Sequence, residues 1–513
     1  MTECATSFIS TKWWSGSLIV LALISHFLCN AQQVLQTNRF ELFSSRDETA
    51  FDVLPAHENG LFLYRRVGTD RQDHIQLIKL DTAFKEQWKG FLPIDNRFVL
   101  VGKKVEEGKL YFLLRYHDFT RNNFQLFSID VATGDFVLRD IKNFIPFTPT
   151  EFQVTHKGAI MGGYYNQVPV VIYYAFETGR ARVLPGLLNE AGDLTQLKAY
   201  ADGTFDVLIS ARNYKGQNTI FIKSYDENGD LLRNFALEPT DNSHLIFARS
   251  MKTPNNLEIV AGVFGGKNSL YSRGLFLAGI DLDGHQQLRY YNYGDLDNFF
   301  KYMKAKREAR VKERIERRKI KGKKTKFNYR FLVHEIVPYK NQYILLGEAF
   351  YPKYVSTDHS LSPFFYNSGG MPSTMMRDGR LFDGYHYTHA VVMGFDQKGN
   401  LLWDNSFEIN DVKTFTLEQF VKLEVQGDRI ALLYLFDNEL RTKIIQDDQV
   451  LEGKSIEDIK TNFDSDIVRK EQTSMNKLEY WYKDYFYAYG VQEIANAERG
   501  KRRVFFINKI TCN

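Results

Sequence analysis

The sequence predicts an all-β protein assembled from a repeated unit of about fifty residues, and two observations lead to this prediction. Aromatic residues make up 15% of the 513 residues, as 41 Phe, 29 Tyr and 5 Trp, and aromatic side chains favour strands. A short turn motif recurs along the chain, and two strand-like runs precede most of its copies. The net charge of +4 excludes a polycation, so the chain as a whole is not a nucleic-acid-coating protein.

The repeated turn is an acidic residue followed closely by glycine. An aspartate side chain accepts hydrogen bonds from backbone amides two residues on, and glycine adopts positive φ, so together they close a hairpin. The step from Asp281 to Asp396 is more than twice the usual spacing, so this unit carries extra material. The turns are Asp130–Gly134, Glu177–Gly179, Asp226–Gly229, Asp281–Gly284 and Asp396–Gly399, with a copy lacking glycine at Asp81.

Two hydrophobic runs precede or accompany each turn, and a third follows it. Repeats of this length with four short antiparallel strands predict a β-propeller of about eight blades, with seven as the alternative because residues 451–477 are polar. A tandem of β-sandwiches is the competing architecture. The paired runs are 61–64 with 75–80, 110–116 with 124–129, 159–165 with 169–174, 205–209 with 219–224, 257–263 with 274–280, 342–349 with 390–395, 430–435 with 441–445, and 485–489 with 503–507.

Two of the turns resemble those of known propeller repeats. The segments Phe127-Ser-Ile-Asp-Val-Ala-Thr-Gly134 and Gly394-Phe-Asp-Gln-Lys-Gly-Asn-Leu-Leu-Trp403 are similar to turns of quinoprotein-type and NHL-type repeats. The similarity covers most of the chain, but only at the level of the repeat. Such turns are structural in those families, so the resemblance implies a fold and no activity.

The two ends of the chain fit a closed ring. The last unit stops at its third strand, 503–510, and the segment Asn38–Ser45 alternates polar with apolar residues before the first unit. We expect this segment to supply the missing outer strand of the last blade. Closure of this kind removes sheet edges that would otherwise aggregate.

The N-terminus predicts export. Lys12 precedes an apolar core, Leu18–Ile24, that suits a signal peptide and is too short to span a bilayer. Small residues in Cys29-Asn30-Ala31 predict cleavage after Ala31, giving a signal peptide at 1–31 and a propeller at 32–513. Acylation of Cys29 and an uncleaved anchor are the alternatives. The expected location is the periplasm, the cell surface or the extracellular space, with no transmembrane segment after cleavage. Cleavage leaves Cys512 as the one cysteine, so no internal disulfide forms.

The long unit contains a strongly basic insertion at 300–328. Residues 301–326 carry 14 Lys and Arg against three Glu, and the absence of Pro and Gly from Tyr302 to Ile320 predicts a charged helix ending at Gly322. It is either a surface that binds an anionic partner or a solvated linker between blades. The export signal argues against nucleic acid as the natural ligand. The candidate binding residues are Lys304, Lys306, Arg307, Arg310, Lys312, Arg314, Arg317 and Arg318.

A second insertion, 351–386, is rich in aromatic residues and methionine. A long loop of this composition suits a partner surface or a lid, and the alternative is a loop that packs its own aromatic side chains over the mouth of the propeller. An inter-blade link and a link from second to third strand leave a four-stranded blade on the same face, so we expect both insertions side by side on one face. The candidate residues are Phe364, Phe365, Tyr366, Met375, Met376, Tyr385 and His386.

Motifs for catalysis are absent from the sequence. It contains no Gly-x-Ser-x-Gly elbow, zinc-binding HExxH helix or phosphate-binding loop, and we predict no cofactor and no metal site. His386 and His389, three apart in a strand, are expected to face opposite sides. Enzymatic activity stays open, because propeller enzymes assemble sites from separate blades. We therefore expect an exported binding or scaffold module of a bacterial cell envelope that engages a protein or an anionic envelope component. The alternative is an enzyme or carbohydrate-binding protein that uses the mouth of the central channel.

Overall fold

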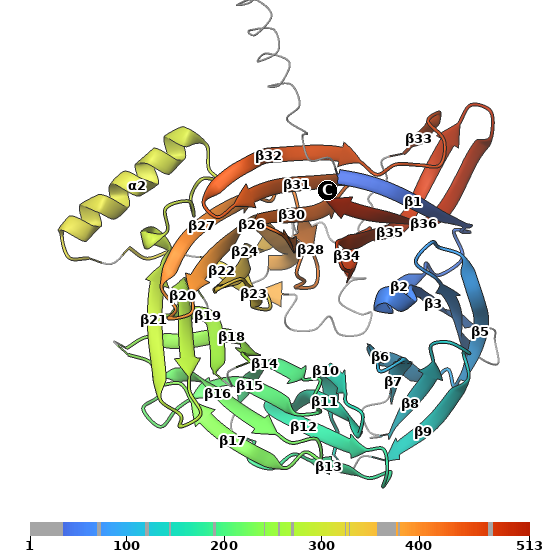
Figure 1. The fold of residues 1–513 in the computed structure, drawn as a ribbon, viewed down its shortest axis with the longest axis horizontal. Coiled ribbons are helices and arrows are strands. Elements are labelled where there is room, and N and C mark those ends of the chain that lie inside the picture. Colours follow the sequence, from blue (N-terminus) through green and yellow to red (C-terminus); the bar gives the residue numbers. More distant parts are fainter. Residues whose placement is uncertain are drawn as a thin grey trace, which may run out of the picture.

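A computed structural model describes residues 34–512, except for 69–72, 118–122, 143–144, 188–190, 241, 255–256, 268–270, 324, 328, 357–375, 378–379 and 470–475. Eight antiparallel sheets stand around a central axis, and the colours of Figure 1 follow the chain once around the ring. The fold prediction is confirmed as a β-propeller with eight blades.

Blades 1 to 5 each contain four strands, and the first strand of each lies nearest the axis (Figure 1). The strands are β2 (Asp52–Pro55), β3 (Leu61–Gly68), β4 (Asp73–Leu80) and β5 (Glu86–Ile94); β6 (Phe98–Glu106), β7 (Lys109–Tyr116), β8 (Asn123–Asp130) and β9 (Phe136–Lys142); β10 (Thr148–Val154), β11 (Gly158–Tyr165), β12 (Val168–Ala175) and β13 (Ala181–Val183); β14 (Gly192–Ala199), β15 (Phe205–Arg212), β16 (Asn218–Tyr225) and β17 (Leu231–Ala236); β18 (His244–Lys252), β19 (Glu258–Gly265), β20 (Ser272–Ile280) and β21 (Gln286–Asn292).

Blades 6 and 8 carry short extra strands, and the 16-residue helix α2 (Ala305–Ile320) lies in the link from blade 5 to blade 6. Blade 6 contains β22 (Arg330–Val333), β23 (Val337–Tyr339), β24 (Gln342–Ser356), β25 (Met376–Arg377), β26 (Arg380–Asp396), β27 (Leu401–Glu408) and β28 (Lys413–Thr414). Blade 7 contains β29 (Lys422–Gln426), β30 (Arg429–Phe436), β31 (Glu439–Gln446) and β32 (Gln449–Asp458). Blade 8 contains β33 (Asp466–Val468), β34 (Lys477–Tyr482), β35 (Tyr485–Asn496), β36 (Gly500–Cys512) and β1 (Val34–Phe43).

The acidic–glycine turns form as the sequence predicts. In the β16–β17 turn, Oδ1 of Asp226 accepts hydrogen bonds from the backbone amides of Asn228 (2.9 Å) and Asp230 (2.7 Å), and Gly229 has φ of 82°. Glycine is also needed because the turn approaches the preceding blade. A Cβ atom at Gly229 would lie 3.0 Å from the side chain of Leu184. The turn therefore closes its own hairpin and contacts its neighbour.

The ring closes with a strand from the N-terminal end of the described chain. Strand β1 pairs antiparallel with β36 from Val34↔Cys512 to Phe43↔Val504, as expected for an outer strand of the last blade. The guanidinium of Arg39 is buried in this blade and donates to Oε1 of Gln492 (2.7 Å) and Oδ1 of Asn508 (2.8 Å). Because its hydrogen bonds are satisfied, the buried cation stabilises one register of closure.

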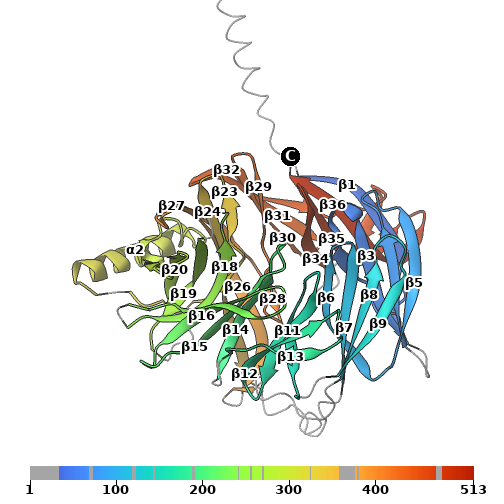
Figure 2. The same ribbon diagram turned by 60° about the horizontal axis from the view of Figure 1, so that its bottom comes forward.

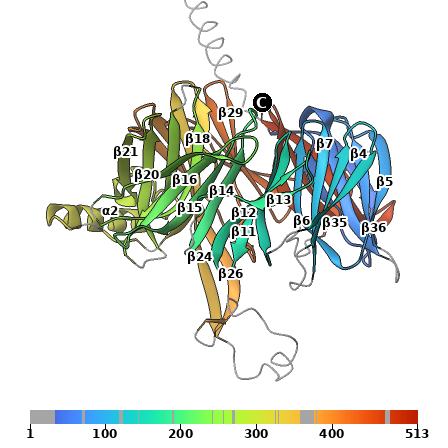
Figure 3. The same cartoon turned by 90° about the horizontal axis from the view of Figure 1, so that it is seen from below.

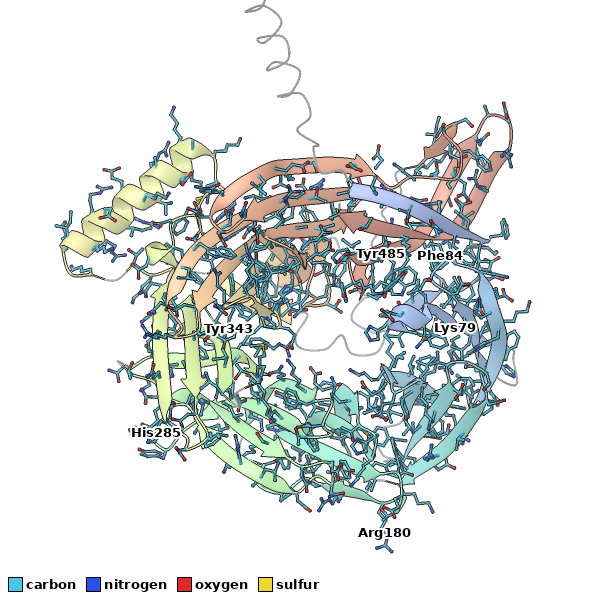
Figure 4. The ribbon with its side chains drawn as sticks, viewed as in Figure 1. Lys79, Phe84, Arg180, His285, Tyr343 and Tyr485 are labelled. Carbon is cyan, nitrogen blue, oxygen red and sulfur yellow. The ribbon has the colours of Figure 1, made fainter. Side chains whose placement is uncertain are left out.

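The seam between blades 8 and 1 is packed with aromatic side chains. Trp481 is fully buried, stacks on Phe84 with ring centroids 5.6 Å apart, and donates its indole N–H to the carbonyl of Gly60. Figure 4 shows Phe84 beside Tyr485 at this seam. The hydroxyl of Tyr489 donates to Asp52 across the same boundary at 2.6 Å. The seam between the two ends of the described chain is therefore a buried, hydrogen-bonded aromatic core.

A buried carboxyl group lies at the boundary of blades 7 and 8. Glu424 is 5% exposed, and burial, followed by the charge of Asp484, raises the pKa of its carboxyl group from 4.5 to about 8. The thiol of Cys512 faces it, and burial raises the pKa of this thiol as well. The predicted lone cysteine is therefore a core residue and not an activated nucleophile.

We predict that this carboxyl group makes the fold less stable as pH rises. A folded-state pKa above the unfolded value means that the native state holds the proton longer, so stability falls as pH rises from about 5 to about 8. Glu258, whose pKa burial and Asp206 also raise, adds a slope of the same sign. Urea unfolding of Glu424→Gln should show a clearly smaller loss between pH 5 and pH 8.5 than the wild-type protein. Equal losses in both proteins would contradict the prediction.

Candidate functional site

The most prominent departure from the regular propeller is the hairpin formed by β24 and β26. These strands have 15 and 17 residues and remain paired to Ser356↔Arg380, well beyond the end of the blade. Figure 3 shows the hairpin projecting from one face of the ring. The prediction of a loop throughout 351–386 is therefore corrected at both ends, where the chain continues as paired strands.

Aromatic pairs run along the base of the projecting hairpin. Tyr351 stacks on His386 across the two strands with ring centroids 5.6 Å apart, and Phe382 contacts Tyr385 edge to face at 5.0 Å. The pair of Tyr351 and His386 joins the two strands, and cross-strand pairs of this kind stabilise a hairpin. Tyr351 nevertheless stays 43% exposed, so the hairpin offers aromatic surface to a partner.

A carboxylate organises the cations on this hairpin. Asp383 accepts hydrogen bonds from Lys413 (2.6 Å) and His386 (3.2 Å) and forms an ion pair with Lys353 (3.3 Å). The hydrogen bond from Lys413 is the main reason that the pKa of Asp383 falls to about 2. Because Lys413 belongs to β28, this cluster ties the link from blade 6 to blade 7 onto the hairpin.

That link, residues 409–421, carries apolar side chains into solvent. Phe415 is 64% exposed and Leu417 is 44% exposed. A cavity of about 690 Å³ lies beside Phe415, lined by residues 411–416, 418–420, 435–437 and 476–479. A cavity of this size suits a small ligand or the anchoring side chains of a larger partner.

The buried carboxylate of Glu348 fixes the course of the link. It is fully buried, and its Oε1 atom accepts hydrogen bonds from the backbone amides of Phe420 (2.9 Å) and Val421 (2.8 Å). His334 Nε2 approaches the same oxygen at 2.7 Å. One carboxylate thus replaces the hydrogen-bonding partners that these link amides would find in a sheet.

Helix α2 starts three residues later than predicted and ends as predicted. Gly322 follows it with φ of 62°, while Tyr302 lies before the helix and stacks on His389 with ring centroids 3.8 Å apart. Ile315 is the buried residue of the helix and packs near Gly294 and Phe327. Figures 2 and 3 show the helix outside the ring. The helix is therefore attached along a narrow apolar line.

The predicted basic residues are distributed along α2, with Lys304 directly before it. Lys312 pairs with Glu308 at 2.7 Å, and Arg317 pairs with Glu313 at 3.7 Å. The other six form no ion pair within the part of the chain that the structure describes, and each is exposed: Lys304, Lys306, Arg307, Arg310, Arg314 and Arg318.

The two insertions leave the propeller on one face, as its topology predicts. Strand β21 ends at Asn292, level with Gly274 at the β19–β20 end of blade 5, and the β24–β26 hairpin leaves blade 6 at the corresponding end. The helix then runs outward over the rim while the hairpin projects from the face (Figure 3). The expectation that they lie side by side therefore holds at their bases, where Tyr302 contacts His389, and not along their lengths.

The predicted residues of the second insertion have different outcomes. Phe364, Phe365, Tyr366 and Met375 lie outside the described residues, and Met376 belongs to the short strand β25. Tyr385 and His386 are strand residues at the hairpin base.

The expectation for the two histidines is wrong. A bulge at Thr388 pairs His389 with Ala349 and His386 with Tyr351, which places both histidines on the same side of the sheet. His389 is fully buried, and burial lowers its pKa to about 3, so it is a neutral core residue. His386 instead contacts Asp383 and Tyr351.

Sequence reasoning missed a second elongated hairpin, in blade 8. Strands β35 and β36 pair out to Asn496↔Gly500, and β33 adds to them at Asp466↔Asn496. Arg499 lies over the ring of Phe463 at 3.9 Å, and a cavity of about 530 Å³ lies beside residues 458–468. This hairpin joins second and third strands, so it shares the face of the β24–β26 hairpin. Helix α2, the long hairpins of blades 6 and 8, and the link between blades 6 and 7 are the additions of this face, which we call the elaborated face.

Charged side chains also meet along the central channel, where the first strands of different blades face one another. Lys198 of β14 pairs with Glu335 of blade 6 at 2.8 Å, and Arg249 of β18 lies 3.9 Å from the same carboxylate. Burial raises the pKa of Glu151 of β10, against the opposing effect of Arg249. Four blades contribute to this group, so no local motif could have identified it.

Asp281, Asp283 and His285 bring three potential metal ligands within 4.8 Å. Oδ1 of Asp281 accepts hydrogen bonds from the backbone amides of Asp283 (3.0 Å) and His285 (2.8 Å). These are the hydrogen bonds expected of the predicted turn. The turn accounts for this arrangement without a metal ion.

Comparison with known proteins identifies no family for this chain. No protein-family model and no curated protein sequence matches the chain. Similar solved structures include the polysaccharide lyase Uly1, at 9% identity over 93% of this chain and 100% of that one, with a TM-score of 0.41. The Dos1 propeller is 9% identical over 76% and 88% of the two chains, with a TM-score of 0.38. A prolyl endopeptidase structure is 10% identical over 88% of this chain and 53% of its own, with a TM-score of 0.37. At these identities and TM-scores, no activity can be transferred from these proteins to this chain.

Among the described residues, no helix has the length and apolar character to cross a membrane.

We predict that Glu348 is required for order in the link beside the cavity. Glu348→Ala leaves two backbone amides without an acceptor and should cost roughly 2–4 kcal/mol of unfolding free energy. Hydrogen exchange at Phe420 and Val421 should speed up, whereas exchange in blades 1 to 3 should not change. Glu348→Gln keeps an acceptor oxygen and should have a smaller effect. Unchanged exchange at both amides in the alanine variant would contradict this role.

Proposed function

We propose that the protein is an exported binding module of a bacterial cell envelope that engages a macromolecular partner through the elaborated face. The observation that carries this proposal is the one-sided placement of two long hairpins, a cavity and exposed Phe415 and Leu417 on blades 6 to 8. Exposed aromatic side chains beside a cavity are typical anchors of protein interfaces.

The opposite face supports the same proposal by contrast. Its turns between third and fourth strands are short acidic–glycine turns whose side chains bond their own backbone. Such turns are fully explained by the fold and leave little for a partner to recognise. The export signal predicted at 1–31 supports an envelope location and an extracytoplasmic partner.

The test is capture of a partner from envelope extract by immobilised protein, followed by affinity measurement with the purified partner. Phe415→Ala combined with Leu417→Ala should weaken binding at least about tenfold, as expected for removal of two anchoring side chains. The matched control is Leu282→Ala with Leu402→Ala, since these leucines are 52% and 50% exposed at the other end of blades 5 and 6. Equal affinity of the first variant and the wild-type protein would contradict the proposal.

A second candidate function uses the central channel, as an enzyme or a carbohydrate-binding protein. The observation that favours it is the group of Glu151, Lys198, Arg249 and Glu335, which converges from four blades. An acid with a raised pKa beside a guanidinium is typical of functional sites. A soluble ligand whose binding requires Arg249 and Glu335, but not Phe415, would favour this function over the first.

A further inference from the structure

The unpaired cations of α2 form one continuous stripe. Arg307, Arg310, Arg314 and Arg318 follow one another at intervals of three or four residues, so they lie on the same side of the helix. The stripe extends over about 16 Å along the helix axis. The buried residue Ile315 lies on an adjacent side, Glu316 lies away from the stripe, and Glu313 flanks it and pairs with Arg317. A ligand therefore meets four guanidinium groups, while the one flanking carboxylate already has a cationic partner.

The composition of the stripe indicates the chemistry that it recognises. Arginine presents a planar fork that binds carboxylate, sulfate or phosphate through two parallel hydrogen bonds, whereas lysine acts as a point charge. Here all four members of the stripe are arginine, while lysines such as Lys306 and Lys321 lie at its ends. A line of such groups at one per helical turn suits a linear chain that carries oxyanions at regular intervals.

The rest of the helix argues against two other polyanionic surfaces. Proteins that bind single-stranded nucleic acid stack bases on aromatic side chains, and α2 contains no aromatic residue. Helices that insert into an anionic membrane need a broad bulky apolar side, and α2 uses Val311 and Ile315 to pack against the propeller. The ligand that remains is a flexible anionic chain bound from solvent.

We propose that the arginine stripe of α2 binds a linear anionic polysaccharide. This inference rests on the proposed function, because it names the chemical class of one ligand of the elaborated face. The four arginines are exposed and α2 lies outside the ring (Figures 1 and 3), so a polysaccharide chain can lie along them without entering the cavity near Phe415. The same molecule can therefore hold a polymer at the helix and a second partner at the link.

The experiment measures binding of residues 32–513 to polygalacturonate and to heparin, as uronate and sulfate probes, at low and high salt. The test variant replaces the four stripe arginines with glutamine, which keeps helix propensity. The matched control replaces Lys89, Lys142, Arg180 and Lys215 with glutamine. These residues are exposed on other blades, as Arg180 in Figure 4 shows, and their replacement changes the net charge equally.

The wild-type and control proteins should bind at least one of the two probes, with affinity falling steeply as salt rises, and the stripe variant should bind about tenfold or more weakly. Circular dichroism tests whether the variants are folded. If the stripe variant does not fold, the salt dependence of binding by the wild-type protein still tests the proposal. Binding that survives in the stripe variant, or absence of binding to both probes, would overturn the proposal. Stronger binding to oligodeoxythymidine or to phosphatidylglycerol vesicles would overturn it too.

The variant Phe415→Ala with Leu417→Ala separates this inference from the proposed function. It should bind polysaccharide as the wild-type protein does while losing its partner. Failure of polysaccharide binding with partner capture intact would remove the inference about α2 and leave the proposed function standing.

Discussion

The pairing of β1 with β36 is the constraint on which the rest of the structure depends. These strands come from opposite ends of the described chain, and their pairing turns eight separate blades into a ring in which every blade is packed on both sides. The buried, fully bonded Arg39 specifies one register, and Trp481 with Phe84 fills the seam. Because closure removes exposed sheet edges and fixes the blades relative to one another, long links and hairpins can vary without loss of the fold.

The additions are concentrated where the ring does not need them. Turns between third and fourth strands contact the preceding blade, as Gly229 does with Leu184, so lengthening them would disturb blade packing. Links on the other face meet no such restriction. Long links that the structure describes have a specific buried anchor, such as Glu348 for residues 420–421 and Ile315 for α2. The ring does not need these links, yet buried side chains hold them in place. This is consistent with selection for the surface that the links form.

Much of the fold could be predicted from the sequence because its signals are local. The acidic–glycine turns, the alternating segment before the first blade and the long run without Pro or Gly each depend on neighbouring residues, and each corresponds to a turn, to β1 or to α2. The candidate site was less predictable because its geometry depends on distant contacts. A bulge at Thr388 reverses the expected orientation of two histidines, and the hydrogen bonds of Glu348 join residues more than seventy positions apart. The charges of the channel come from four blades and leave no pattern in any of them.

The most direct test of the binding-face account is site-specific photo-crosslinking in living cells. A photoreactive amino acid placed at position 415 should crosslink to a partner of defined mass, whereas the same group at position 282, on the opposite face and comparably exposed, should not. A defined adduct at position 282 with none at position 415 would contradict the account, since it would place the partner on the face that the short turns occupy.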